Sequence, residues 1–377
     1  MGVGQSDAPD SSQAGRDATQ RALAGREPAL MIVFCSISHD LTALPRAVRA
    51  VAGRTVPLVG CTTAGEIAGS RAGALGAVVV ALGGPGLSVS TSVGELARGA
   101  RAAGQTAAHA ITSVDAPNQV LLLLSDGLVG DRLEIVRGAY GYAGASIPIV
   151  GGCAGDDLAM QRTYQLYGQE SLSNAVIGAA IGSTGPIGVG IGHGFEHFGE
   201  PIVVTESNGS RLITLDHRPA LDVYLERLGA PPQAYTDPST WKRFGLLFGL
   251  QRPRGHEVRC VRGADYQDRS LLCPDVPQGT LVSTMRGHAD AVMRGTEAAR
   301  DQALAMLNGQ PPIGLLAFDC AARRTIIGEH GILDEVATIR QPARDTPLAG
   351  FYTMGEFGRV QGSRGVHNTT LVMLALA

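Results

Sequence analysis

The chain has 377 residues, 44% of them hydrophobic, and a formal net charge of −3 at pH 7. This length predicts two domains, and the weak negative charge gives no electrostatic reason to expect nucleic acid or an anionic membrane as a partner. No apolar run reaches the roughly 18 residues of a membrane span, and the six cysteines form no C-x-x-C pair and are best interpreted as reduced thiols, so we expect a cytoplasmic protein.

Taken in chain order, residues 1–25 are mostly small and polar and predict a disordered tail with at most one short helix. An apolar strand follows at residues 31–36, then a helix that Asp40 would cap and Gly53 would end, then a second strand entered through Pro57. The same order of elements recurs further along the chain, and a further helix precedes the later two copies. The pattern predicts one β-α-β unit used three times.

The second strand of each unit ends in a glycine-rich bend that carries a carboxylate. The bends are Gly60-Cys-Thr-Thr-Ala-Gly-Glu66, Gly151-Gly-Cys-Ala-Gly-Asp156 and Gly350-Phe-Tyr-Thr-Met-Gly-Glu356. Parallel strands joined by crossover helices place their carboxyl ends on one edge, so we expect the three acids to meet at a shared rim around a small ligand. In the alternative interpretation the glycines only form turns and the acids only bind backbone amides.

Between the second and third units, short strands separated by Gly, Pro and Asn replace the strand-helix pattern. Those at residues 164–206 predict an antiparallel meander, and those at 246–285 predict a second series of hairpins. A proline-rich stretch at 229–238 is the best linker candidate. The predicted fold class is α/β, with mixed β-sheets flanked by helices, built from repeated β-α-β units plus antiparallel hairpins, in two domains at residues 26–229 and 230–377.

With these motifs the chain resembles FIST proteins. The resemblance rests on the three bends, on Val204-Thr-Glu206, on Phe318-Asp-Cys320 with Arg323, and on His367-Asn-Thr-Thr370, and it extends through N-terminal and C-terminal FIST modules. It implies a bacterial sensory protein of signal transduction that binds a small polar metabolite, amino acids being the suggested class. Because no output domain is left over, it implies action on a separate partner, such as a histidine kinase of a two-component system or another signalling protein.

Chemistry and resemblance together give the candidate site. Hydroxyls, carboxylates and glycine amides of the bends would offer donors and acceptors to a zwitterion, an arginine would pair with its carboxylate, and aromatic rings would add apolar area. The candidate ligand-binding residues are Cys61, Thr62, Thr63, Gly65, Glu66, Gly152, Asp156, Arg323, Phe351, Tyr352, Thr353, Gly355, Glu356, His367 and Asn368.

Structural roles compete with ligand contact at several of these positions. Arg323 could instead form an internal ion pair with Asp319 or Glu329, and the two aromatic residues of the third bend could belong to the core. His367 and Asn368 open the final apolar strand and could simply tie down a neighbouring loop. The sequence leaves both interpretations open.

Two other functions are weighed. A haem-binding nitric-oxide sensor of the same family is the alternative, because His193 and His197 lie beside aromatic residues, although the chain ends in His-Asn-Thr-Thr rather than the Asn-Gln-Thr-Phe pattern associated with the haem branch. A thiol-dependent enzyme using Cys61 or Cys153 is the third, but no catalytic signature surrounds either cysteine. We therefore expect no catalytic residue, and a metal or cofactor only if haem is bound.

Overall fold

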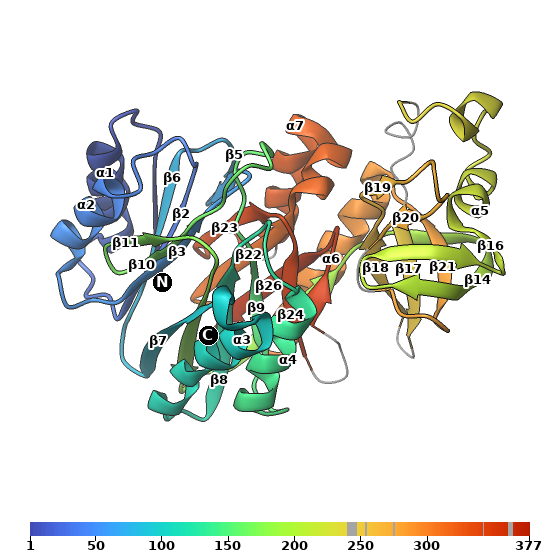
Figure 1. The fold of residues 1–377 in the computed structure, drawn as a ribbon. Helices are drawn as coiled ribbons and strands as arrows, with labels where there is room; N and C mark the ends of the chain where they lie inside the picture. Colours follow the sequence, from blue (N-terminus) through green and yellow to red (C-terminus); the bar gives the residue numbers. More distant parts are fainter. Residues whose placement is uncertain (240–246, 253–254, 274–275, 342, 361–364) are drawn as a thin grey trace. The chain divides into compact units, whose positions relative to one another are not determined.

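A computed structural model gives the structure of residues 1–239, 247–252, 255–273, 276–341, 343–360 and 365–377 (Figure 1). The chain forms two compact units. The first, which we call the core unit, comprises Met1–Gly192, Met293–Val366 and Thr370–Ala377; the second, the inserted unit, comprises His193–Val292 and His367–Thr369. Among the described residues, no helix has both the length and the apolar character needed to cross a membrane.

The core unit contains three six-stranded sheets built on one plan. In each, two parallel central strands are flanked by antiparallel strands. The first sheet has the order β1 (Gly2–Ser6), β6 (Ala77–Leu82), β2 (Leu30–Cys35), β3 (Leu58–Thr62), β10 (Gln165–Tyr167), β11 (Glu170–Leu172). The second has β7 (Leu87–Glu95), β12 (Ala175–Ser183), β8 (Asn118–Ser125), β9 (Ile149–Cys153), β24 (Glu356–Arg359), β25 (Val366–His367). The third has β13 (Ile187–Gly192), β26 (Leu371–Leu376), β22 (Gly314–Cys320), β23 (Leu348–Thr353), β4 (Glu66–Ala68), β5 (Arg71–Gly73).

Each sheet buries both faces, which is why its central strands read as continuous apolar runs. Two helices cover the outer face of each sheet: α1 (Ser11–Leu23) and α2 (Ala43–Ala52), α3 (Ala100–Ala108) and α4 (Arg132–Ala143), and α6 (Ala289–Ala305) and α7 (Ala321–Ile339). The inner faces share one apolar core, to which the three sheets contribute, among others, Phe34, Leu122 and Phe318. The three-fold use of one β-α-β unit is therefore confirmed.

The three units also exchange strands. After the first bend the chain enters the third sheet, where Glu66 of β4 pairs with Phe351. After the third bend it enters the second sheet, where Glu356 pairs with Gly152, and after the second bend it returns to the first sheet as β10 and β11. Each bend is thus the point at which one repeat crosses into the next.

The expected disordered tail at residues 1–25 is wrong. These residues form β1 and α1, whose N-terminus is capped by Asp10 accepting the Gln13 N–H at 2.7 Å. Ala14, Ala18 and Ala22 are fully buried, and Gly4 lies so close to the Ala18 carbonyl that a side chain would not fit. Small residues that looked like tail composition are what allows the helix to pack directly on the strand, and they complete the first copy of the repeat.

The inserted unit is built of antiparallel strands. Its sheet has the order β18 (Gly255–Cys260), β17 (Leu247–Arg252), β21 (Leu281–Arg286), β14 (Glu196–Asn208), β15 (Arg211–Leu215), β20 (Leu271–Leu272), β19 (Gly263–Ala264), with β16 (Arg218–Pro219) beside β15. The helix α5 (Ala220–Arg227) buries Leu221, Tyr224 and Leu225 in the same core as Phe248. The predicted hairpins at 246–285 are present, since β17 pairs with β18 and β19 pairs with β20. The predicted meander at 164–206 is wrong, because its four strands join four different sheets: β10 the first, β12 the second, β13 the third and β14 that of the inserted unit.

In the sequence, the inserted unit follows β13 and extends into the start of α6. At the equivalent place in the first repeat, only Asp7 to Asp10 separate β1 from α1. The compact units therefore differ from the predicted domains at 26–229 and 230–377. The predicted boundary falls inside the inserted unit, because the proline-rich stretch after α5 forms the short helix η3 (Pro232–Tyr235), which buries Ala234 in that unit's core. Only two further short helices, η1 (Leu96–Arg98) and η2 (His109–Ser113), occur among the described residues.

Candidate functional site

The three glycine-rich bends meet in the core unit, as the repeated pattern predicts. Every pair of bends shares backbone hydrogen bonds. One bond of each pair runs from the Tyr352 N–H to the Gly65 carbonyl (2.8 Å), from the Gly155 N–H to the Thr62 carbonyl (2.9 Å) and from the Cys153 N–H to the Gly355 carbonyl (2.8 Å). The acids do not form an open rim, however: Glu66 and Glu356 have no exposed surface and Asp156 is 1% exposed.

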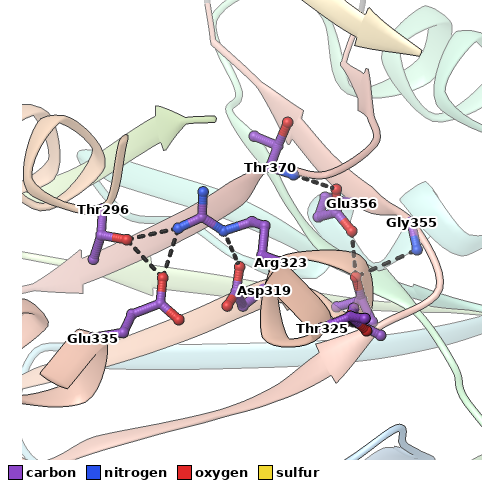
Figure 2. Close-up of polar contacts among 10 residues, drawn as sticks. Thr296, Asp319, Arg323, Thr325, Glu335, Gly355, Glu356 and Thr370 are labelled. Carbon is purple, nitrogen blue, oxygen red and sulfur yellow. Dashed lines mark hydrogen bonds and ion pairs between the residues drawn. The ribbon is translucent and has the colours of Figure 1, made fainter. Parts of the chain in front are cut away.

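The first and third bends hold their acids in the same way. In the first, the Thr63 hydroxyl donates to one oxygen of Glu66, and the other oxygen accepts the N–H groups of Leu75 (2.8 Å) and Gly76 (3.1 Å). In the third, Thr353 donates to Glu356. The second oxygen of Glu356 accepts the Thr370 N–H at 3.2 Å, as Figure 2 shows. A buried carboxylate is stabilised by such donors, so these two acids tie their bends to the residues just before β6 and β26, the last strands of their repeats.

Burial changes the acidity of both groups. It raises the pKa of Glu66 and of Glu356 from 4.5 to about 7, against the opposing effect of the hydrogen bonds that each carboxylate accepts. The two acids therefore titrate near neutrality.

An arginine lies over the glycine of each of these bends. The Nη1 atom of Arg324, from α7, is 2.6 Å from where a Cβ of Gly65 would stand, and it donates to the Ala64 carbonyl at 3.0 Å. Arg132, from α4, has the same relation to Gly355, with its Nη1 also at 2.6 Å. Gly65 has a φ of +117°, so a side chain here would be strained as well as crowded.

Replacing Gly65 by alanine should therefore lower the free energy of unfolding by about 2 to 4 kcal/mol, from backbone strain and the lost Arg324 hydrogen bond. Gly25→Ala is the matched control, because Gly25 also has a positive φ, +82°, but nothing within 4 Å of the added carbon. It should cost only about 1 kcal/mol, the strain contribution. Urea unfolding of both variants measures the difference, and equal losses would show that the arginine contact contributes nothing.

Arg323 forms the internal ion pairs of the alternative interpretation. Its Nε donates to Asp319 at 2.6 Å, and its Nη2 contacts Glu335 and the Thr296 hydroxyl, each at 2.6 Å (Figure 2). Glu335 takes the place expected of Glu329. Burial, and then Glu335, raise the pKa of Asp319 well above its usual range. Arg323 has no exposed surface, so in this structure it holds α6, α7 and β22 together rather than facing a ligand.

The second bend departs from the plan of the other two. Ala154 stands where they have Thr63 and Thr353, and the chain makes a loop after Asp156 instead of entering a strand. The Asp156 carboxylate accepts three N–H groups of this loop, those of Met160 (3.0 Å), Gln161 (2.6 Å) and Arg162 (3.0 Å). Asp156 therefore binds backbone amides, as the alternative interpretation holds.

A pocket of about 320 Å³ opens beside this loop. Its lining residues come from three segments: Asp126, Leu128, Val129, Gln161, Arg162, Thr163, Tyr164, Ser173 and Asn174. It lies after the carboxyl end of β8, where ligands of α/β sheets bind. The pocket forms where the three-fold plan is broken, and none of the predicted site residues lines it.

Two charged groups mark the pocket. Asp126 is 3% exposed, and its Oδ1 accepts the N–H groups of Leu128 and Val129 (2.9 and 3.0 Å). Its Oδ2 accepts one N–H group from the described residues, that of Asn174 (3.2 Å). The exposed guanidinium of Arg162 has no hydrogen bond or ion pair to any described residue. The pocket thus presents one carboxylate oxygen with spare accepting capacity and one uncommitted cation.

The remaining predicted residues have structural surroundings. Cys61 and Phe351 lie in the inner core, and Tyr352 is buried with Arg324 over its ring at 5.4 Å. The Thr62 hydroxyl accepts the Tyr164 N–H at 3.0 Å and so supports the pocket from behind. His367 and Asn368 are buried, and His367 lies in β25, the neighbour of β24 in the second sheet.

The residues proposed for the alternative functions are two buried cysteines and two histidines of the inserted unit. Burial raises the pKa of the Cys61 thiol well above its ordinary value, and Cys61 and Cys153 have no exposed surface. His197 is exposed on β14, and His193 Nδ1 accepts the Phe195 N–H at 2.9 Å. Neither histidine lines the pocket beside the second bend.

Comparison with known proteins gives matches over nearly the whole chain. The FIST N domain matches residues 29–218 and the FIST C domain matches residues 220–359. The chain is 28% identical over 396 residues to the Mycobacterium tuberculosis protein Rv0628c, covering 99% of this chain and 98% of that one. It is 26% identical over 388 residues to the Mycobacterium bovis protein Mb0898c, covering 99% and 97%.

Proposed function

Because the chain belongs to the FIST family, whose domains are associated with sensory signal transduction, we propose that it is a bacterial cytoplasmic sensor that binds a small polar metabolite such as an amino acid. It passes the signal to a separate protein, such as a histidine kinase of a two-component system. The observation that supports this most is the pocket beside the second bend, formed where one of three equivalent repeats departs from the others.

The chemistry of the pocket suits a zwitterion. Arg162 would pair with the ligand carboxylate, since a guanidinium binds a carboxylate through two parallel hydrogen bonds. Asp126 Oδ2 would accept from the ligand ammonium, and Asn174 and Ser173 add further polar groups. The interlocked bends, including most of the residues predicted from sequence, form the frame that holds these groups in place.

The family's association with sensing also suggests a role other than catalysis. A haem-bound nitric-oxide sensor is the alternative, and its test is a Soret band after haem reconstitution that is lost in His193→Ala or His197→Ala. A spectrum without a Soret band leaves the metabolite sensor as the proposal.

The proposal is tested by purifying the protein from a bacterial host, identifying co-purifying small molecules by mass spectrometry, and screening them with the amino acids by thermal shift. We expect at least one to raise the melting temperature of the wild type, because a ligand that binds only the folded state stabilises it. The rise should be lost in Arg162→Ala and kept in Arg54→Ala, an exposed arginine outside the pocket. A rise that survives in Arg162→Ala would place the ligand elsewhere.

A further inference from the structure

The outer strands β1, β7 and β13 occupy equivalent places at the margins of the three sheets. Each pairs on one side with the last strand of its repeat, and no strand of the described residues pairs with its other edge. Unpaired edges attract other strands, and proteins usually cover them.

The edges of β1 and β13 are covered by side chains of the adjacent helix. The Arg21 guanidinium of α1 donates to the Gln5 carbonyl. Gln302 of α6 accepts the Ile191 N–H at 2.8 Å, and the Val189 N–H donates to the Met306 sulfur at 3.4 Å.

On β7 no side chain of the adjacent helix makes an equivalent bond to the outer edge among the described residues. Tyr167 of β10 contacts this edge at Thr91, where its hydroxyl donates to the Thr91 carbonyl (3.4 Å) and accepts from the Thr91 hydroxyl (3.3 Å). Arg21 lies three positions after Ala18, and Gln302 lies three positions after Ala299. The carbonyl of each of these alanines lies against a glycine of the neighbouring strand. In the second repeat that alanine is Ala103, against Gly94, and the residue three positions on is Thr106. The Thr106 hydroxyl instead donates to Ala102 of its own helix at 3.0 Å.

The edge of β7 also lacks the sequence features that discourage pairing. The strand is nine residues long, Leu87–Glu95, and has no proline and no charge before its last residue. In an antiparallel strand alternate residues direct N–H and C=O to the same side. Thr91 lies on the outer side, since its carbonyl accepts the Tyr167 hydroxyl at 3.4 Å, a long hydrogen bond, and Val89 and Val93 lie on that side with it.

We propose that β7 is a self-association edge at which a second copy of this chain adds its own β7 in antiparallel register. Residues 89–93 read Val-Ser-Thr-Ser-Val, the same in both directions. A two-fold axis at Thr91 therefore places Val89 of one copy opposite Val93 of the other, and Thr91 opposite itself. Such self-complementary pairing is what a closed two-fold dimer requires.

The test measures the mass of the full chain in concentrated solution by analytical ultracentrifugation. The molecular mass measured for the wild type should be twice the 39.0 kDa of one chain. Thr91→Lys and Thr91→Asp should each be monomeric, because like charges then face each other across the axis, and an equimolar mixture of the two should recover the dimer. Thr55→Lys, at an exposed position away from β7, should remain dimeric.

Circular dichroism confirms that each variant is folded. A monomeric wild type would overturn the proposal, and so would a mixture of folded Lys and Asp variants that stays monomeric. The readout is mass alone, so failure of the ligand proposal would leave this result unaffected.

Discussion

A chain from which the inserted unit has been removed should still fold. In this variant residues 193–288 are replaced by Asp-Ala-Pro-Asp, the sequence that joins β1 to α1 in the first repeat. The three sheets, their six helices and the inner core all lie outside the deleted segment. The first residues of α6, which group with the inserted unit, are retained. We expect native helix content by circular dichroism and one cooperative thermal transition.

A chain that stops at Arg218, where the FIST N match ends, is the contrasting variant and should not fold. It keeps the first two repeats but loses β22, β23 and β26, so β4 and β5 have no sheet to join. It also loses Phe318 and Phe351 from the inner core. Deleting each such side chain costs about 3 to 5 kcal/mol, and whole domains are stable by only about 5 to 15 kcal/mol. A folded 1–218 fragment, or an unfolded deletion variant, would contradict the three-repeat core.

The stability of the protein should fall as the pH rises from 5 to 8. In the folded state Glu66 and Glu356 have pKa values of about 7, whereas the unfolded chain has ordinary values near 4.5. Between these pH values the folded state holds protons that the unfolded state has released, so ionisation favours unfolding. A rise in pKa from 4.5 to about 7 corresponds to roughly 3 kcal/mol for each acid, lost across that window. The raised pKa of Asp319 acts in the same direction.

Urea unfolding at pH 5 and pH 8 measures this effect. The double variant Glu66→Gln, Glu356→Gln cannot ionise at either position and should show a much smaller difference between the two pH values. His39, whose pKa is lowered by burial, favours the opposite trend and is present in both proteins. A wild type that gains stability from pH 5 to 8 would show that the two acids are held as carboxylates in the fold.

Local patterns in the sequence predicted much of the core unit. Asp40 does accept the N–H groups of Thr42 and Ala43 at the start of α2, and Gly53 ends that helix with a φ of +104°. Local patterns could not predict the exchange of strands between repeats, because they do not specify which sheet a strand joins after its bend. A tail with at most one short helix was predicted in place of β1 and the full length of α1, because the buried face of α1 is alanine, which composition alone does not distinguish from a tail.

The candidate site was predicted less well than the fold. The bends converge as expected, but burial of their acids depends on the inner packing of all three sheets. The pocket combines residues near 126, 162 and 174, which no spacing rule connects. Two signals were present. Asp126 directly follows a buried strand, the place where α/β proteins put binding groups. The loop after Asp156, absent from the other two copies, was the second.

The most direct test of the account is a calorimetric titration of the best-stabilising amino acid into three proteins. We predict saturable binding to the wild type, a Kd at least about tenfold higher in Arg162→Gln, as loss of a charge-assisted hydrogen bond implies, and a Kd within about twofold of the wild type in Glu66→Gln. Absence of binding to the wild type, or loss of affinity in Glu66→Gln with none in Arg162→Gln, would contradict it.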